Sequence, residues 1–361
     1  MDEADVAVLW PSRLLLPPRP PLLIYLDLNH WISLAKAATG HRDGHRFAGC
    51  LATARDARSS GAALFPLSGS HYMELSGIQD PAQRQSIATV MEELSGFATL
   101  LSRPTVMRLE IAAVLDDRLR PSRSAYEPVH LVGHGVSHAF GKKGTLHITD
   151  DFGHDVTKTL SAAQRETLRH ADLQVQQAML AGPPDDKVAE LRERGWDPTA
   201  ARRIARSRAD EEREQVARLD AEVRWRRGRL RDVVGARELL IELPDMLDEA
   251  LEDRELTLAG VIGDRERART FLRSMPTTDV SIDLKTEMHR NGQRAARWSA
   301  NDVFDMDALS LAVPYCDVVV TENHSHDALT RSGSAATRYK TEVFRDLRSL
   351  EARLRAVAEP D

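Results

Sequence analysis

The sequence predicts an α/β protein with a central, mainly parallel sheet and a mostly α-helical insertion. Two apolar runs, "LLIYL" at 22–26 and "DVVVT" at 317–321, have the length and composition of strands buried on both faces. Each lies beside a stretch whose apolar residues are spaced as in a helix. Residues 104–290 are highly charged and mostly helical in pattern. We therefore expect residues 1–103 and 291–361 to form one discontinuous domain, into which 104–290 is inserted.

The elements follow in order along the chain. After the first strand, Trp31, Ile32, Leu34 and Ala35 have helical spacing. A second short strand is predicted in "AALFPLS", and helical segments run from "SHYMELSG" through "EELSGFATLLS". The inserted part shows no strand alternation, and "LVGHGVSHAFGKKG" and "AGPPDD" mark its loops. The last part predicts a helix in "NDVFDMDALSLAV", then the strand "DVVVT", and a closing helix at about 341–357.

Composition limits the class of protein. With 361 residues, 42% of them hydrophobic, the chain can form one large domain or two ordinary ones. Its two cysteines, Cys50 and Cys316, predict neither a disulfide framework nor a zinc site and favour a reducing compartment. The acidic N-terminus, interrupted by "PPRPP", lacks the pattern of a secretory signal, and no apolar run is long enough to span a bilayer. We expect a cytoplasmic protein with no membrane partner. The net charge of −6 neither requires nor excludes a polyanionic partner.

The first candidate functional residue is Asp27, at the end of the "LLIYL" strand. A carboxylate between a strand and the following helix occupies the place where open α/β sheets bind ligands. The alternative is that Asp27 or Asn29 only caps the helix. The sequence around this one residue leaves both interpretations open.

A second carboxylate, Glu74, lies one turn inside the helix that follows "FPLS", which Ser68 or Ser70 can cap. A solvated surface glutamate is the alternative. His71 and Glu74 share a helix face, but the chain offers no matching second pair of this kind, which disfavours a histidine-based metal site.

A third group of acids lies near the C-terminus. If Asn301 caps the helix there, Asp302 and Asp305 share one face of its first turn, where acidic residues are common for electrostatic reasons alone. The following strand ends at a further acid, Glu322. Carboxylates that converge at one edge of a sheet repel one another unless a divalent cation neutralises them. All-oxygen ligands favour Mg²⁺ or Mn²⁺ over zinc.

The order of these acids resembles the PIN-like domain superfamily of metal-dependent nucleases. The pattern of that family consists of a strand followed by an aspartate, a glutamate on an early helix, an aspartate at the start of a late helix, and an acid after a "VT" strand. The matching positions are Asp27, Glu74, Asp305 and Glu322, and Asp302 is a possible additional ligand. The resemblance covers about 1–103 and 291–361. It implies a three-layer α/β/α fold and a metal site formed by these residues.

Two positions near this pattern differ from it. The family often has an aspartate two residues after the threonine of "VT", whereas Asn323 occupies that place here and Glu322 precedes it. Asp307 fits less well than Asp305, because we expect it to point to another face of the helix.

The resemblance implies a Mg²⁺- or Mn²⁺-dependent endonuclease that hydrolyses phosphodiester bonds, with RNA favoured over DNA. By family analogy alone it also suggests a toxin or an effector of defence against phage. Two alternatives stay open: a catalytically degenerate PIN-like binding or scaffold module, and a metal-dependent phosphohydrolase of a small substrate. Asp27-Leu28-Asn29 differs from the usual phosphohydrolase motif, in which a second aspartate follows two residues after the first. The sequence defines neither a regulator nor a homo-oligomer.

Candidate substrate-binding residues are basic. Residues 202–237 hold twelve arginines against seven acids, and Trp225 lies between Arg224 and Arg226. Such a cluster can bind phosphates and stack on unpaired bases. The alternative is a solvated helix whose apolar stripe of Val216, Leu219, Val223 and Leu230 packs on a neighbour. The full set of basic candidates is Arg224, Arg226, Arg227, Lys142, Lys143, Arg290, Arg294 and Arg297.

Overall fold

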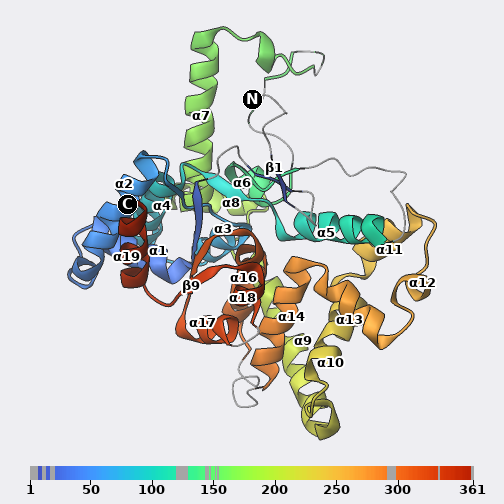
Figure 1. The fold of residues 1–361 in the computed structure, drawn as a ribbon. Coiled ribbons are helices and arrows are strands. Elements are labelled where there is room, and N and C mark those ends of the chain that lie inside the picture. Colours follow the sequence, from blue (N-terminus) through green and yellow to red (C-terminus); the bar gives the residue numbers. More distant parts are fainter. Residues whose placement is uncertain are drawn as a thin grey trace.

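The structure is a computed structural model that describes residues 7–9, 14–16, 21–118, 129–142, 146, 148–150, 152, 154–290, 298–331 and 334–358 (Figure 1). Its strands are β1 (Ala7–Leu9), β2 (Leu14–Leu16), β3 (Leu22–Leu26), β4 (Ala63–Leu64), β5 (Ala98–Leu100), β6 (Val129–His130), β7 (Val132–His134), β8 (Val318–Val320) and β9 (Glu342–Phe344). Its α-helices are α1 (Leu28–Ala38), α2 (Ala48–Ser59), α3 (Gly69–Leu75), α4 (Pro81–Ser95), α5 (Arg103–Arg118), α6 (Gly135–Ala139), α7 (Ala162–Ala181), α8 (Val188–Glu193), α9 (Ala200–Ala221), α10 (Leu230–Arg237), α11 (Pro244–Glu252), α12 (Leu258–Ile262), α13 (Arg265–Arg273), α14 (Pro276–Arg290), α16 (Ala300–Tyr315), α17 (Asn323–Thr330), α18 (Ala335–Tyr339) and α19 (Leu347–Ala358). Short 3₁₀ turns and one π-helical turn, η6 (Glu238–Glu242), connect them.

A four-stranded parallel sheet lies at the centre, in the order β4-β3-β8-β9. β3 and β8 are its inner strands, and Leu26 pairs with Val320 at their carboxyl ends. The strands expected at 22–26 and 317–321 are therefore confirmed, and the two ends of the chain build one sheet. Parallel neighbours end at the same edge, so the residues that follow β3 and β8 lie side by side.

Helices cover both faces of this sheet. Successive side chains of β3 point to opposite faces, and both sets are buried. Ile24 and Leu26 face a cluster built with α1, α2, α4 and α19. Leu23 and Tyr25 face a second cluster that includes α14 and α16. In Figure 1, α1, α2, α4 and α19 form one group and α16 and α18 another, with β9 between them. The expected α/β class is confirmed at this level.

Two expected helices are shorter than their sequence pattern indicated. The helical stretch through "EELSGFATLLS" ends at Ser95, and 98–100 is strand β5, because Gly96 and Phe97 both adopt left-handed backbone angles. The closing helix expected at 341–357 begins only at Leu347, and strand β9 precedes it after the left-handed residue Lys340. A left-handed residue interrupts helical hydrogen bonding, and neither Phe97 nor Lys340 is a residue type that signals it.

The inserted part also differs from expectation, because it contains the strands β6 and β7. β7 pairs antiparallel with β5, and β6 pairs in parallel with β2. Each has only two or three residues, too few to show an alternating pattern.

The helices α9 and α14 of the same part pack on α16, and Ala205, Ala209 and Leu284 belong to the core cluster beneath the sheet. The helix α7 projects from the body of the molecule (Figure 1). None of the helices in the described ranges combines the length and apolar character needed to cross a membrane.

Candidate functional site

Two carboxylates follow the two inner strands of the sheet. Asp27 comes directly after β3, and its backbone N–H donates to the carbonyl oxygen of Val320 at the end of β8 at 3.0 Å. Glu322 follows β8 after Thr321 and takes the N-cap position of α17. Asp27 itself is 6% exposed, and its carboxylate accepts a hydrogen bond from the Thr321 hydroxyl at 3.3 Å. The topology of the sheet therefore brings the first and the last of the four acids together.

Two more carboxylates come from helices beside this edge. Glu74 lies near the end of α3 and Asp305 in the second turn of α16, and the two helices are in contact. A pocket of about 350 Å³ is lined by Glu74, Asp302, Asp305 and Glu322, together with Asn29 and others. Asp27 does not line this pocket, but its charge acts on both Glu74 and Asp305, so all four acids that the sequence pattern selected lie at one site.

Electrostatic repulsion is the main feature of this pocket. Burial, the charge of Asp27 and the charge of Glu74 raise the pKa of Asp305 to about 9. Burial and the Asp27 charge raise the pKa of Glu74 to about 8, although Arg202 opposes this. Burial and the Glu322 charge raise the pKa of Asp27 to about 6. Burial and the neighbouring charges therefore shift Asp27, Glu74 and Asp305 toward their neutral forms, as expected for carboxylates crowded without a cation.

The cap interpretation of Asp27 receives partial support. Asp27 occupies the N-cap position of α1, and its side chain accepts no cap hydrogen bond of standard geometry, although the backbone N–H groups of Leu28 and Asn29 act to lower its pKa. Burial and the Glu322 charge outweigh them and raise the pKa, because desolvation disfavours the charged form.

Asp302 has a structural role instead. The expected cap of α16, Asn301, is wrong, because the N-cap is Ser299. Asp302 completes a capping box with it: the Asp302 carboxylate accepts from the Ser299 backbone N–H at 2.8 Å and from its hydroxyl at 2.6 Å. Asp302 lines the pocket and adds to the repulsion on Asp305, but one of its oxygens is already engaged.

His71, the possible partner of Glu74 in a histidine-based site, is fully buried and used structurally. Its Nδ1 accepts from the Ser68 backbone N–H at 3.0 Å, and its Nε2 donates to the Leu26 carbonyl oxygen at 2.8 Å. Burial lowers its pKa to about 4. Ser68, one of the two expected caps, forms the capping box of α3 with this ring. The two hydrogen bonds of His71 connect the start of α3 to the end of β3, and they thereby fix the position of Glu74 on the same helix.

Glu322 and Asn323 are separated by the turn after β8. Glu322 lines the acidic pocket and accepts a hydrogen bond from the Asn29 side-chain amide. Asn323 is exposed and faces a neighbouring hollow. The carboxylate, rather than the amide, is therefore directed toward the other acids.

The basic candidates lie in different places. Arg290 is exposed at the end of α14 and pairs with Glu287 at 3.2 Å, two residues beyond Met288, which lines the pocket. Lys142 is exposed after α6. Lys143, Arg294 and Arg297 lie outside the described residues.

The arginines of the 224–227 segment lie beyond the far end of α9. Arg202 and Ala221 are nineteen residues apart on that helix, which separates them by about 28 Å at 1.5 Å per residue. Arg224 bonds to Glu222, and Arg226 bonds to Asp220 and to the His289 carbonyl oxygen. Arg227 is exposed. The alternative of an apolar stripe agrees with the burial of Val216, Leu219 and Leu230.

Arg202 belongs to the arginine cluster predicted at 202–237, but it was not predicted to lie at the acidic site. It lines the acidic pocket near the start of α9, and its guanidinium donates to the Asn301 side-chain oxygen at 3.3 Å. Asn29 is the second residue missed, since only its capping role was considered. Its position two residues after Asp27 at the strand end was the available signal.

The donor set fits a hard divalent cation, although the arrangement is not that of a closed metal site. In the described part of the chain, no three or more His, Cys, Asp or Glu side chains are arranged so that they could hold a metal ion as they stand. The acids of the pocket nevertheless offer only oxygen donors, which Mg²⁺ and Mn²⁺ prefer. Their raised pKa values show that Arg202 does not neutralise them. A cation would remove the repulsion that keeps them apart.

Comparisons with protein-family models, with curated proteins and with solved structures find no match for this chain.

Proposed function

We propose that this protein is a Mg²⁺- or Mn²⁺-dependent endonuclease with a PIN-like α/β/α domain, and that its substrate is RNA. One observation carries the proposal: Asp27, Glu74, Asp305 and Glu322, from four separate elements, meet at the carboxyl end of a parallel sheet, and repulsion within this group helps to raise the pKa values of Asp27, Glu74 and Asp305. A fold tolerates such repulsion where a ligand compensates for it, and clustered groups with shifted pKa values mark functional sites.

Each acid has a distinct role in this proposal. Asp27 and Asp305 are the central ligands, because they are the most enclosed by the other acids, while Glu74 and Glu322 complete the site or orient water. When bound, the cation supplies a nucleophilic water at neutral pH and neutralises charge on the phosphodiester. Thr321 holds the Asp27 carboxylate, and Asn29 holds that of Glu322. Asp302 fixes the start of α16 and so the position of Asp305.

One cationic side chain of the site orients the substrate. Arg202 lines the pocket from α9, whereas Arg290, two residues past the pocket-lining Met288 on α14, is exposed on another face and pairs with Glu287. A phosphodiester that approaches four acids is repelled by them, and a fixed guanidinium group at the pocket reduces that repulsion.

Incubation with mixed single-stranded RNA and DNA, with and without Mn²⁺, tests the proposal. We expect wild type to cleave RNA only with the metal, Asp27→Asn and Asp305→Asn to be inactive, and Asp248→Asn to cleave normally. Asp248 is an exposed acid on α11 and serves as the matched control. Cleavage that does not need Mn²⁺, or persists in Asp305→Asn, contradicts the proposal.

Two other results correspond to the alternatives. RNA binding without cleavage under any divalent cation indicates a degenerate binding module. Hydrolysis of a chromogenic phosphomonoester, with no cleavage of nucleic acid, indicates a phosphohydrolase of a small substrate.

A further inference from the structure

A second hollow, of about 770 Å³, adjoins the acidic pocket. The two share Asn29, Glu322 and His324, so the hydrogen bond from Asn29 to Glu322 lies on their common rim. The wall of the second hollow comes from α1, the start of α2 and the turn between β9 and α19. This hollow is referred to below as the arginine pocket.

Three arginines define it: Arg46, Arg345 and Arg348. All three are exposed, and none has an ion-pair partner among the described residues. Arg46 lies over the ring of Phe47, with 4.6 Å from the guanidinium carbon to the ring centroid. Other arginines of this chain, such as Arg208 with Asp307, already pair with a carboxylate. The guanidinium groups of Arg345 and Arg348 help to lower the pKa of Asp327 and Asp346, respectively, but they form no ion pair with them and can contact an external anion.

The acids of the same hollow have partners. Asp346 accepts from the Ser349 backbone N–H at 2.8 Å, as the cap of α19. Glu351 pairs with Arg355 on the same helix. Glu322 accepts from Asn29 and belongs to the acidic pocket. The hollow is thus lined by three arginines and three acids; the acids are hydrogen-bonded or ion-paired, whereas the guanidinium groups of the three arginines form no ion pair within the described residues.

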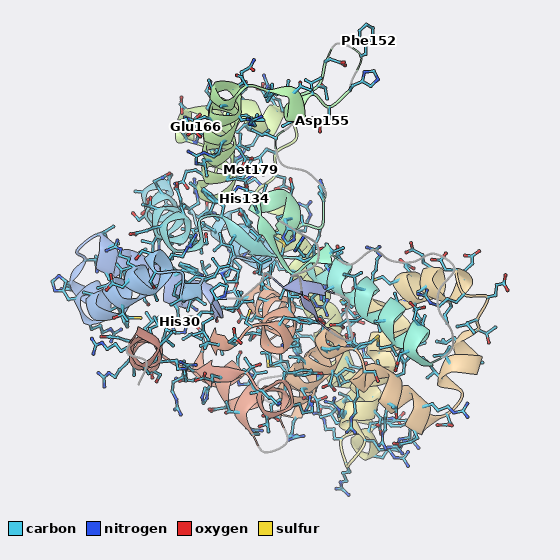
Figure 2. The ribbon with its side chains drawn as sticks, turned by 45° about the horizontal axis from the view of Figure 1, so that its top comes forward. His30, His134, Phe152, Asp155, Glu166 and Met179 are labelled. Carbon is cyan, nitrogen blue, oxygen red and sulfur yellow. The ribbon has the colours of Figure 1, made fainter. Side chains whose placement is uncertain are left out.

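The wall of the arginine pocket also contains a polar atom that the protein leaves unsatisfied. His30 lies between the N-terminal helices and the last helix (Figure 2). Its Nε2 is buried and has no hydrogen-bond partner in the part of the chain that the structure describes. A buried polar atom without a partner is uncommon in folded proteins and is usually satisfied by water or a ligand. His324, on the shared rim, offers a further polar side chain.

We propose that the arginine pocket binds the phosphate backbone of single-stranded nucleic acid adjacent to the bond that lies at the acids. This inference rests on the proposed function and adds the path of the substrate. A strand across the common rim places one phosphate among the carboxylates and the next ones against Arg345, Arg348 and Arg46. The Arg46 guanidinium, which lies over the Phe47 ring, supplies a plane on which an unpaired base can stack. Guanidinium groups beside the acids reduce their repulsion of the substrate.

The test is binding in EDTA, where cleavage is absent. The probe is a fluorescein-labelled single-stranded oligouridylate, followed by fluorescence anisotropy over a range of salt concentrations. The variant carries Arg345→Gln with Arg348→Gln. Its matched control carries Arg192→Gln with Arg273→Gln, two exposed arginines on α8 and α13 that also have no ion-pair partner in the described ranges. Both double variants remove the same charge.

We expect the Arg345/Arg348 variant to bind about tenfold more weakly and its salt slope to fall by about 1.4, since each phosphate contact to a single strand contributes about 0.7. The control keeps the wild-type slope and a Kd within about twofold of wild type. A duplex of the same length loses less affinity than the single strand. Equal affinity and slope in wild type and the Arg345/Arg348 variant overturn the inference, as does an equal loss in the control.

Cleavage assays keep this result separate from the proposed function. If wild type cleaves RNA with Mn²⁺ but the Arg345/Arg348 variant binds like wild type, the arginine pocket is not the substrate path and the nuclease proposal stands. If binding depends on these arginines but no metal supports cleavage, the binding site stands and the nuclease proposal fails. Absence of any binding by wild type overturns the arginine pocket in either case.

Discussion

Replacing Asp305 by asparagine should stabilise the metal-free protein while it abolishes cleavage. The pKa of Asp305 is raised from 3.8 to about 9, so at pH 7 the folded protein holds a proton that the unfolded chain does not. At about 1.36 kcal/mol for each pH unit between 3.8 and 7, this costs the folded state about 4 kcal/mol. Asparagine has no charge to suppress and avoids this cost. Because the amide must also be desolvated and the neighbouring acids share the repulsion, we expect a gain of about 1–2 kcal/mol.

The sign of the pH dependence follows from the direction of the pKa change. A carboxyl group whose pKa is higher in the folded state contributes its full stability below pH 4 and loses it as the pH rises toward 9. Metal-free wild type should therefore lose stability over this range, and Asp305→Asn should lose less of it. The difference between the two proteins is larger at pH 7 than at pH 5.

Thermal melting in EDTA at pH 5 and pH 7 measures this difference. We expect Asp305→Asn to melt about 1–3 °C above wild type at pH 7, since a chain of 361 residues unfolds with an entropy of about 0.76 kcal/mol/K. Excess Mn²⁺ should then raise the melting temperature of wild type more than that of the variant, because only the intact site gains binding energy on folding. If Asp305→Asn melts below wild type at pH 7 without metal, Asp305 is a structural partner and the reasoning from repulsion fails.

Two further predictions test neighbours of this residue. Glu322→Gln should raise the Mn²⁺ concentration for half-maximal cleavage at least about tenfold, since it removes a full charge from the site, whereas Asn323→Ala should change it less than about twofold; the reverse pattern means that the amide faces the metal. Asp307→Asn should lower the free energy of unfolding by about 2–4 kcal/mol in chemical denaturation, because it leaves Arg103 and Arg208 without their shared carboxylate, and an unchanged midpoint contradicts this role.

The parts of the fold that could be predicted are those in which a local pattern and the tertiary environment agree. The runs "LLIYL" and "DVVVT" are apolar because both faces of the inner strands are buried, so the sequence alone identifies them. The strand β5 was missed although the left-handed Gly96 ends α4, because it has only three residues within a continuous apolar pattern. The strand β9 was missed because the left-handed residue that ends α18 is Lys340 and not the usual glycine. Short strands at the edges depend on their partners more than on their own sequence.

The residues of the site likewise separate into those that could be predicted from a local pattern and those that could not. Asp27 and Glu322 could be placed together from sequence, because each ends a strand and parallel strands share an edge. Arg202 could not, because its position depends on how α9 packs against α16 through Ala205 and Ala209, a contact between segments about a hundred residues apart. The arginine pocket likewise joins the start of α2 to the turn before α19. Residues that meet only through tertiary packing leave no spacing signal in the sequence.

Asp305 and Asp307 show how strongly this environment decides the chemistry of a residue. They are two positions apart on α16 and therefore point to different faces of the helix. Asp305 faces other acids, and its pKa is raised, whereas the pKa of buried Asp307 is lowered by the charges of Arg103 and Arg208, which overcome the effect of burial. Arg208 lies on α9 in the inserted part of the chain, and Arg103 is the first residue of α5, which continues into that part. The ion pairs of Asp307 with Arg103 and Arg208 thus hold one face of α16. On another face of the same helix, Asp305 lines the acidic pocket among other acids.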